Sequence, residues 1–150
     1  MSRFSSPLEY EQFIYNLLQD FPVILRSTLV LVKRGRYFAE VRGELAFAND
    51  HRLVVYERLR WDDSPMTIVR YGYEAWHGDE ELYWYDSQSH PYDPTLAVTD
   101  PHHKHFPPDA KHHRVPAPGL SFDPPNLPFL IHEIESTLSL PRPNLTTPYE

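Results

Sequence analysis

Apolar side chains near the start of the chain recur every three or four residues, as on one face of a helix: Tyr10, Phe13, Ile14, Leu17 and Leu18. Ser6 precedes them as a candidate N-cap, and Pro7 suits the first helical position. Glu9 stands three residues after Ser6, as in a capping box. The pattern predicts a helix over residues 7–19.

From residue 23 to residue 86 the hydrophobic period changes to two, which is typical of half-buried strands. The run from His51 to Trp61 alternates clearly and gathers Arg52, Arg58 and Arg60 on one side. The connections are too short for crossover helices, so they favour four to five antiparallel strands in meander order. Such a sheet can leave one face in water and pack the N-terminal helix on the other.

The last third of the chain has a different composition. Thirteen of the 16 prolines lie from Pro91 onward, which predicts a long Pro/His-rich loop over residues 87–125. Apolar residues at helical spacing then predict a second helix over residues 126–138, followed by a tail over 139–150. The expected architecture is a single α+β domain over residues 1–150, in which one helix precedes the sheet along the chain and one follows it.

Composition and charge exclude several classes of protein. The chain has no cysteine, so disulfides and thiolate chemistry are excluded. Its net charge of −7 speaks against an extended nucleic-acid-binding surface, although a small basic site remains compatible with it. No apolar run approaches the roughly 18 residues of a membrane span, and the N-terminus has no signal-peptide core. We therefore expect a cytoplasmic protein without a membrane partner.

The segment DPHHKHFPPDAKHHR, residues 100–114, concentrates five of the nine histidines. Histidine titrates near pH 6.5, so His102, His103 and His105 offer acid–base groups near neutral pH, and Lys104 offers a cation for a phosphorane. The same three histidines could instead hold a divalent metal with a nearby aspartate. A polar loop packed on the sheet would also explain them.

Two carboxylates outside this segment are also candidates for a functional role. Glu57 falls on the apolar face of its strand, where a buried carboxylate needs a partner or a raised pKa. Arg70 or a loop histidine is the expected partner. Asp86 ends a strand and either caps the following turn or orients an imidazole such as that of His90.

The run RYGYEAWHGDEELYWYDSQSHP, followed by PHHKH, resembles the TumE-like toxins of bacterial and archaeal toxin–antitoxin systems. The resemblance is strongest over residues 70–105. It falls on a tyrosine-rich hairpin ending in Tyr-Asp, a nearby His-Pro and a His-His-Lys-His block: Tyr71, Tyr73, Tyr85, Asp86, His90, His102, His103, Lys104 and His105. It implies a toxin that acts beside a cognate DNA-binding antitoxin.

Residue chemistry then suggests a metal-independent ribonuclease with RNA as its partner and no cofactor. His103 and His105 would exchange protons, Lys104 would stabilise the phosphorane, and Asp86 would orient an imidazole. Tyr71 or Tyr73 would contact base or sugar, and Tyr85, Arg70 and Glu57 complete the expected substrate-binding set. The alternatives are a non-enzymatic protein-binding module and a histidine-rich protein that binds a divalent metal through His102, His103 and His105.

Overall fold

The computed structural model describes residues 4–62, 65–87, 101–107 and 114–139. Its elements follow in the order α1 (Pro7–Tyr15), α2 (Leu17–Asp20), β1 (Arg26–Ser27), β2 (Val30–Lys33), β3 (Phe38–Ala46), η1 (Ala48–Asp50), β4 (His51–Arg60), β5 (Thr67–His77), β6 (Glu80–Asp86), β7 (His103–His105), β8 (Arg114–Pro116) and α3 (Leu127–Ser139). No described helix combines the length and apolar character that crossing a membrane requires.

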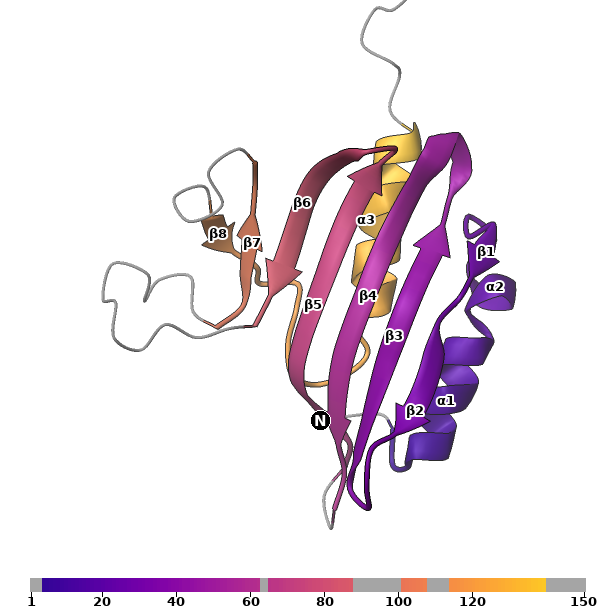
Figure 1. Cartoon of the computed structure of the whole chain (residues 1–150), viewed down its shortest axis with the longest axis vertical. Coiled ribbons are helices and arrows are strands. Elements are labelled where there is room, and N and C mark those ends of the chain that lie inside the picture. The colour runs from indigo at the N-terminus through magenta and orange to yellow at the C-terminus, as the bar shows by residue number, and fades with distance from the viewer. Residues whose placement is uncertain (1–3, 63–64, 88–100, 108–113, 140–150) are drawn as a thin grey trace, which may run out of the picture.

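The strands form one antiparallel sheet in the order β1-β3-β4-β5-β6-β7-β8, and β2 also pairs with β3 (Figure 1). The α+β class and the meander from β3 to β6 are confirmed. The strand number is corrected, because the sheet has eight strands rather than four to five. The additional strands are short: β7 and β8 have three residues each, and they lie in the segment predicted to be loop. Runs of three residues are too short to show a period of two.

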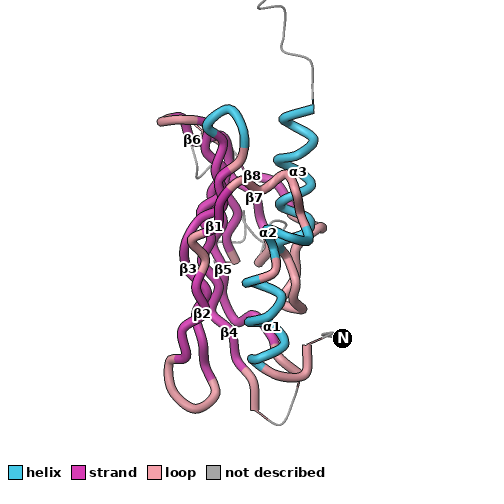
Figure 2. Tube along the Cα trace, turned by 90° about the vertical axis from the view of Figure 1, so that its right-hand side faces the viewer, coloured by secondary structure: helices cyan, strands magenta, loops and turns pink. Residues whose placement is uncertain are grey.

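The helices lie on one face of the sheet, which Figure 2 shows edge-on. Ser6 caps α1 as predicted, because its hydroxyl accepts the backbone N–H of Glu9 at 3.3 Å. The expected helix over residues 7–19 is divided at Asn16 into α1 and α2. The core between helices and sheet includes Ile14 and Leu17 from this segment, together with Ile131 from α3. One face of the sheet is therefore covered by the helices, and the other, which we call the open face, is not.

The edge formed by β1, β2 and β3 depends on a close backbone approach at Gly43. Gly43 has a φ of +137°, and a Cβ placed there would lie 2.6 Å from the carbonyl oxygen of Thr28. The backbone N–H of Thr28 donates to the carbonyl oxygen of Glu44 at 2.9 Å, which fixes this approach. Only glycine meets both requirements without strain.

Candidate active site

The register of the sheet brings residues that are distant in sequence to the β6–β7 pair. Asp86 of β6 lies opposite His103 of β7, and Trp84 lies opposite His105. Directly opposed residues share a face of an antiparallel sheet, and so do residues two apart in one strand. Asp86, His103 and His105 therefore lie on the open face of the sheet, and we call them the triad.

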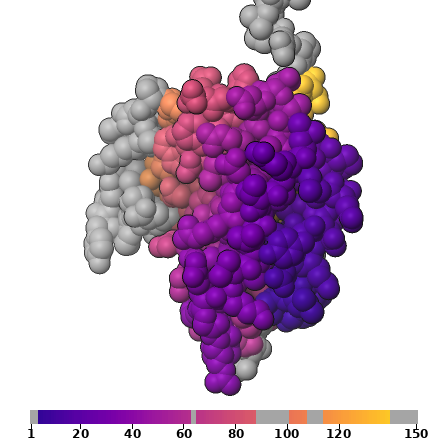
Figure 3. Space-filling model, turned by 45° about the vertical axis from the view of Figure 1, so that its right-hand side comes forward, coloured from indigo at the N-terminus to yellow at the C-terminus, as the bar shows by residue number. Residues whose placement is uncertain are grey.

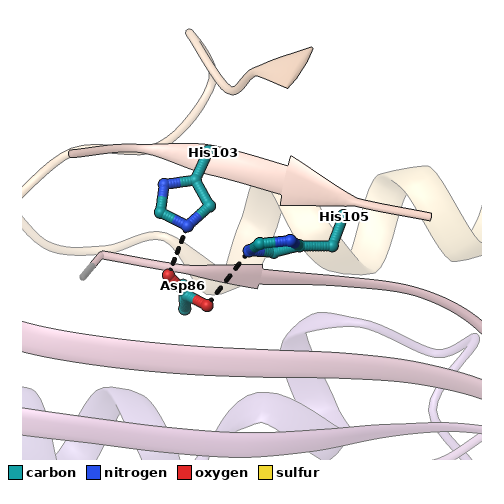
Figure 4. Close-up of side chains that lie close together, drawn as sticks. All are labelled: Asp86, His103 and His105. Carbon is teal, nitrogen blue, oxygen red and sulfur yellow. Dashed lines mark hydrogen bonds and ion pairs between the residues drawn. The ribbon is translucent and has the colours of Figure 1, made fainter. Parts of the chain in front are cut away.

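The Asp86 carboxylate lies between the two imidazoles and contacts both (Figure 4). Its Oδ1 is 2.5 Å from Nε2 of His103, and its Oδ2 is 3.2 Å from Nε2 of His105. The two rings meet edge-on with their centroids 4.5 Å apart. Side-chain exposure is 0% for His103, 9% for His105 and 31% for Asp86. Solvent therefore reaches the triad mainly through Asp86 and His105.

Two neighbours of His105 add an aromatic ring and a cation to this face. The Trp84 ring stacks on the His105 imidazole with a centroid distance of 5.0 Å and an interplanar angle of 11°. Arg114 of β8 lies opposite His105 in the register. The stacking holds the plane of the imidazole. Trp84 was missed in the sequence, although its position two residues before Asp86 places it on the same face.

Lys104 lies on the opposite face of β7, which corrects its expected role beside the histidines. Its Nζ donates to Oε2 of Glu133 on α3 at 2.7 Å and lies 4.0 Å from the centre of the Tyr83 ring. Tyr85 also donates its hydroxyl to the Glu133 carboxylate, at 2.9 and 3.0 Å. The reason is strand alternation, which turns residue 104 away from residues 103 and 105. Lys104 joins β7 to α3 and does not reach the triad.

His102 also lies outside the triad. Its Nδ1 is 2.6 Å from the hydroxyl oxygen of Tyr71, and its ring packs against Phe122 with a centroid distance of 4.5 Å. Burial lowers the pKa of His102, and the neighbouring His103 lowers it further. His102 therefore packs against core residues on the helix-covered face of the sheet and does not join His103 and His105 in the acid–base or metal-ligand set.

Glu57 is fully buried, as its place in the strand pattern indicated, but its partners differ from the expected ones. The hydroxyls of Tyr10 and Tyr73 donate to its two oxygens at 2.5 Å each, and Asn126 in turn donates to the Tyr73 hydroxyl at 3.1 Å. Burial raises the pKa of Glu57, although the two hydrogen bonds oppose the rise. Glu57 joins α1 to the sheet and has no exposed surface.

The three tyrosines expected to contact RNA point into the core. Tyr71, Tyr73 and Tyr85 are all buried, and burial raises the pKa of each phenol. A buried ring offers no face to a base, so the expected contact of these tyrosines with RNA is corrected. Arg70, by contrast, lies on the open face, where its Nη2 donates to the Tyr56 hydroxyl at 3.2 Å.

The remaining candidate, His90, falls outside the described residues. Of the sequence-predicted site, the structure thus brings together Asp86, His103 and His105.

The triad supports two kinds of chemistry. An imidazole held by a carboxylate transfers protons near neutral pH. Two histidines and one carboxylate also form a ligand set for divalent transition metals, and here the ligand atoms lie within 4.8 Å of one another.

Fold and site together define a small α+β protein whose antiparallel sheet is covered by helices on one face and carries a carboxylate–imidazole cluster at its β6–β7 pair. Comparison with family models identifies the particular family, because residues 14–138 match the family described as toxin TumE. The match covers most of the chain, and the chain belongs to this toxin family. No curated protein and no solved structure matches the chain significantly.

Proposed function

We propose that the chain is the toxin of a toxin–antitoxin pair and acts as a ribonuclease through the triad. The observation that carries this proposal is the Asp86 carboxylate, which contacts two imidazoles on the open face of the sheet at 2.5 and 3.2 Å. Family membership supports the toxin role and a cognate antitoxin partner.

In the proposed reaction, His105 and a water molecule carry the protons while the phosphodiester bond is exchanged. His105 accepts the proton of a ribose 2′-hydroxyl, whose oxygen attacks the adjacent phosphorus. The bond from phosphorus to the 5′-oxygen breaks, the leaving oxygen takes a proton from water, and the imidazolium returns its proton to the hydroxide so formed. The products are a 2′,3′-cyclic phosphate and a 5′-hydroxyl. No metal takes part in this scheme.

Each member of the triad has a distinct part in this scheme. His105 is the more exposed imidazole, so it is the one that meets the substrate. Asp86 orients His105 and stabilises the imidazolium. His103 is fully buried and positions Asp86 through the 2.5 Å contact, so, contrary to the expectation from the sequence, it does not exchange protons with RNA directly. Arg114, opposite His105 in the register, replaces Lys104 as the cation near the phosphorane.

A second candidate function is supported by the same geometry. The clustering of two imidazoles and a carboxylate within 4.8 Å favours a divalent cation that would polarise the phosphate instead. The two functions differ in their response to a chelator, because only the second needs the cation.

The test is incubation of the purified chain with total RNA, with and without EDTA, beside a growth assay on induced expression. Cleavage in EDTA that disappears in His105→Gln supports the acid–base ribonuclease, whereas cleavage abolished by EDTA supports the cation. The matched control is His132→Gln, an exposed histidine on α3 with a 65% exposed side chain. Growth arrest and binding of an antitoxin without any RNA cleavage would contradict both and favour a non-enzymatic binding module.

A further inference from the structure

The open face of the sheet carries a group of arginines on the strands that precede β6 in the sheet. Arg42 of β3, Arg58 and Arg60 of β4, and Arg70 of β5 lie on this face, and we call them the arginine patch. In the register Arg58 lies opposite Arg70, and Arg42 lies opposite Tyr56. Figure 3 shows the surface of these central strands in purple to pink, beside the dark blue of α1. Glu40 lies on the same face, opposite Arg58 in the register, so the positive charge is local to the arginine patch.

Aromatic rings fix the guanidinium groups of the patch in place. The Arg42 guanidinium lies 4.5 Å from the centre of the Tyr56 ring, and Arg70 donates to the hydroxyl of the same tyrosine at 3.2 Å. The Arg58 guanidinium lies 4.6 Å from the centre of the Phe38 ring. Guanidinium groups held in this way lose little further side-chain entropy when they bind a phosphate.

The charge of the patch is only partly neutralised. Arg42 pairs with Glu40 at 3.3 Å, and Arg60 pairs with Asp62 at 3.2 Å. In the described part of the chain, Arg58 and Arg70 form no ion pair with a carboxylate. Both guanidinium groups can therefore bind an anionic partner, although Glu40 lies opposite Arg58 in the register and attracts Arg70.

A gap without side chains connects the patch to the triad. The register places Tyr56, Gly72, Asp86 and His103 side by side on four consecutive strands. A Cβ added at Gly72 would meet no atom within 4 Å, so the surface between Tyr56 and Asp86 is open. Adjacent strands lie about 4.8 Å apart, which places Tyr56, the tyrosine that Arg42 and Arg70 contact, about 10 Å from Asp86.

We propose that a single strand of RNA binds across this open face, with phosphates on Arg58 and Arg70, and passes over Gly72 to the triad. The choice of RNA rests on the proposed ribonuclease function, and the charge of the patch supports a polyanion. The path from β4 to β7 spans about 15 Å, which suits a few nucleotides of one strand. Double-stranded RNA modules contact about 16 base pairs, a far longer surface.

The first experiment measures binding separately from cleavage. The probe is a fluorescein-labelled 2′-O-methyl oligouridylate of 12 nucleotides, which lacks the 2′-hydroxyl that the proposed reaction needs. Anisotropy titrations over a range of salt concentrations are expected to show tight, salt-dependent binding by the wild type. The Arg58→Ala/Arg70→Ala variant loses two phosphate contacts, so the slope of log K against log salt falls in magnitude by about 1.4.

The matched control removes the same charge elsewhere. Arg26 lies on β1 at the far edge of the sheet, and Arg36 lies in the turn after β2. Arg26→Ala/Arg36→Ala is expected to keep the wild-type slope. An equal fall in this control would overturn the proposal, because net charge rather than the patch would then set the affinity.

A second variant tests the path over Gly72. Gly72→Phe places a ring in the open gap, whereas Gly72→Ala leaves most of the gap clear. We expect Gly72→Phe to bind the oligonucleotide within about threefold of wild type through the patch, yet to cleave a 2′-hydroxyl RNA at least about tenfold more slowly. Wild-type cleavage by Gly72→Phe would overturn the path.

The outcomes separate this proposal from the ribonuclease itself. Cleavage by the wild type together with an unchanged slope in Arg58→Ala/Arg70→Ala would overturn the RNA surface and leave the ribonuclease standing. Patch-dependent binding without any cleavage would support the surface and contradict the ribonuclease. A wild type that does not bind the oligonucleotide at all would overturn the surface and favour a protein partner on this face.

Discussion

Replacing Glu57 with leucine is expected to destabilise the fold by about 2–6 kcal/mol. The carboxylate is fully buried and accepts one hydrogen bond from Tyr10 and one from Tyr73. Leucine leaves both hydroxyls without this acceptor, and each buried unsatisfied group costs about 1–3 kcal/mol. Because Tyr10 belongs to α1 and Tyr73 to β5, the loss falls on the contact between that helix and the sheet.

The pH dependence of stability provides an independent test of the buried position of Glu57. Burial raises the pKa of Glu57, so the folded state holds its proton to higher pH than the unfolded chain does. The contribution of this group is complete below the unfolded pKa of about 4.3 and is lost as pH rises through the folded pKa, at about 1.36 kcal/mol per unit. Glu57→Gln cannot titrate and so has no such loss. The wild type therefore loses stability relative to Glu57→Gln as the pH rises through that window.

Urea unfolding followed by tryptophan fluorescence at several pH values measures both effects. With a slope of about 2 kcal/mol per molar urea, a cost of about 2–6 kcal/mol shifts the midpoint of Glu57→Leu by about 1–3 M. The exposed Glu135→Leu on α3 serves as the control and is expected to shift little. A Glu57→Leu midpoint equal to that of wild type would refute the reasoning.

The triple variant Tyr10→Phe/Glu57→Leu/Tyr73→Phe separates hydrogen bonding from packing. Removing donors and acceptor together leaves few unsatisfied groups, which is nearly neutral in well-packed sites. We expect it to recover most of the stability that Glu57→Leu loses. A triple variant as unstable as Glu57→Leu would place the cost in packing instead.

Three further predictions follow from single contacts. Gly43→Ala is expected to cost about 1–3 kcal/mol in thermal unfolding, since its φ is +137°, whereas Gly72→Ala should cost nothing; equal costs would contradict the backbone argument. Lys104→Met is expected to lower stability through loss of the 2.7 Å pair with Glu133 while triad-dependent cleavage persists, and abolished cleavage in a folded variant would contradict its exclusion from the site. His102 is expected to titrate below 6.5 by NMR because it is partly buried, and a pKa above 6.5 would contradict its placement.

The strands from β3 to β6 could be predicted from the sequence because each is long enough to show its alternation. Arg58 and Glu57 illustrate this, since adjacent residues of one strand were assigned to opposite faces and lie there. The strands β7 and β8 escaped prediction because three-residue strands between prolines show no period. Their pairing depends on β6, which only the tertiary structure supplies.

The candidate site, like the fold, could be predicted from the sequence only in part. Asp86 and the histidine block could be named from residue chemistry and from the family resemblance. Within β7, successive side chains point to opposite faces of the sheet. His103 and His105 therefore contact Asp86, whereas Lys104 contacts Glu133. Treating the block as a loop hid this alternation, because a loop imposes no fixed face on successive residues.

The central claim is that the triad carries out metal-independent cleavage of RNA, and one rate comparison tests it most directly. The measurement is the cleavage rate of a defined single-stranded RNA in EDTA by the wild type and by His105→Ala, with the fold of both checked by circular dichroism. General acid–base catalysis by one imidazole contributes about 10²- to 10⁴-fold, so we expect a fall of that size. A His105→Ala rate equal to that of wild type would contradict the account.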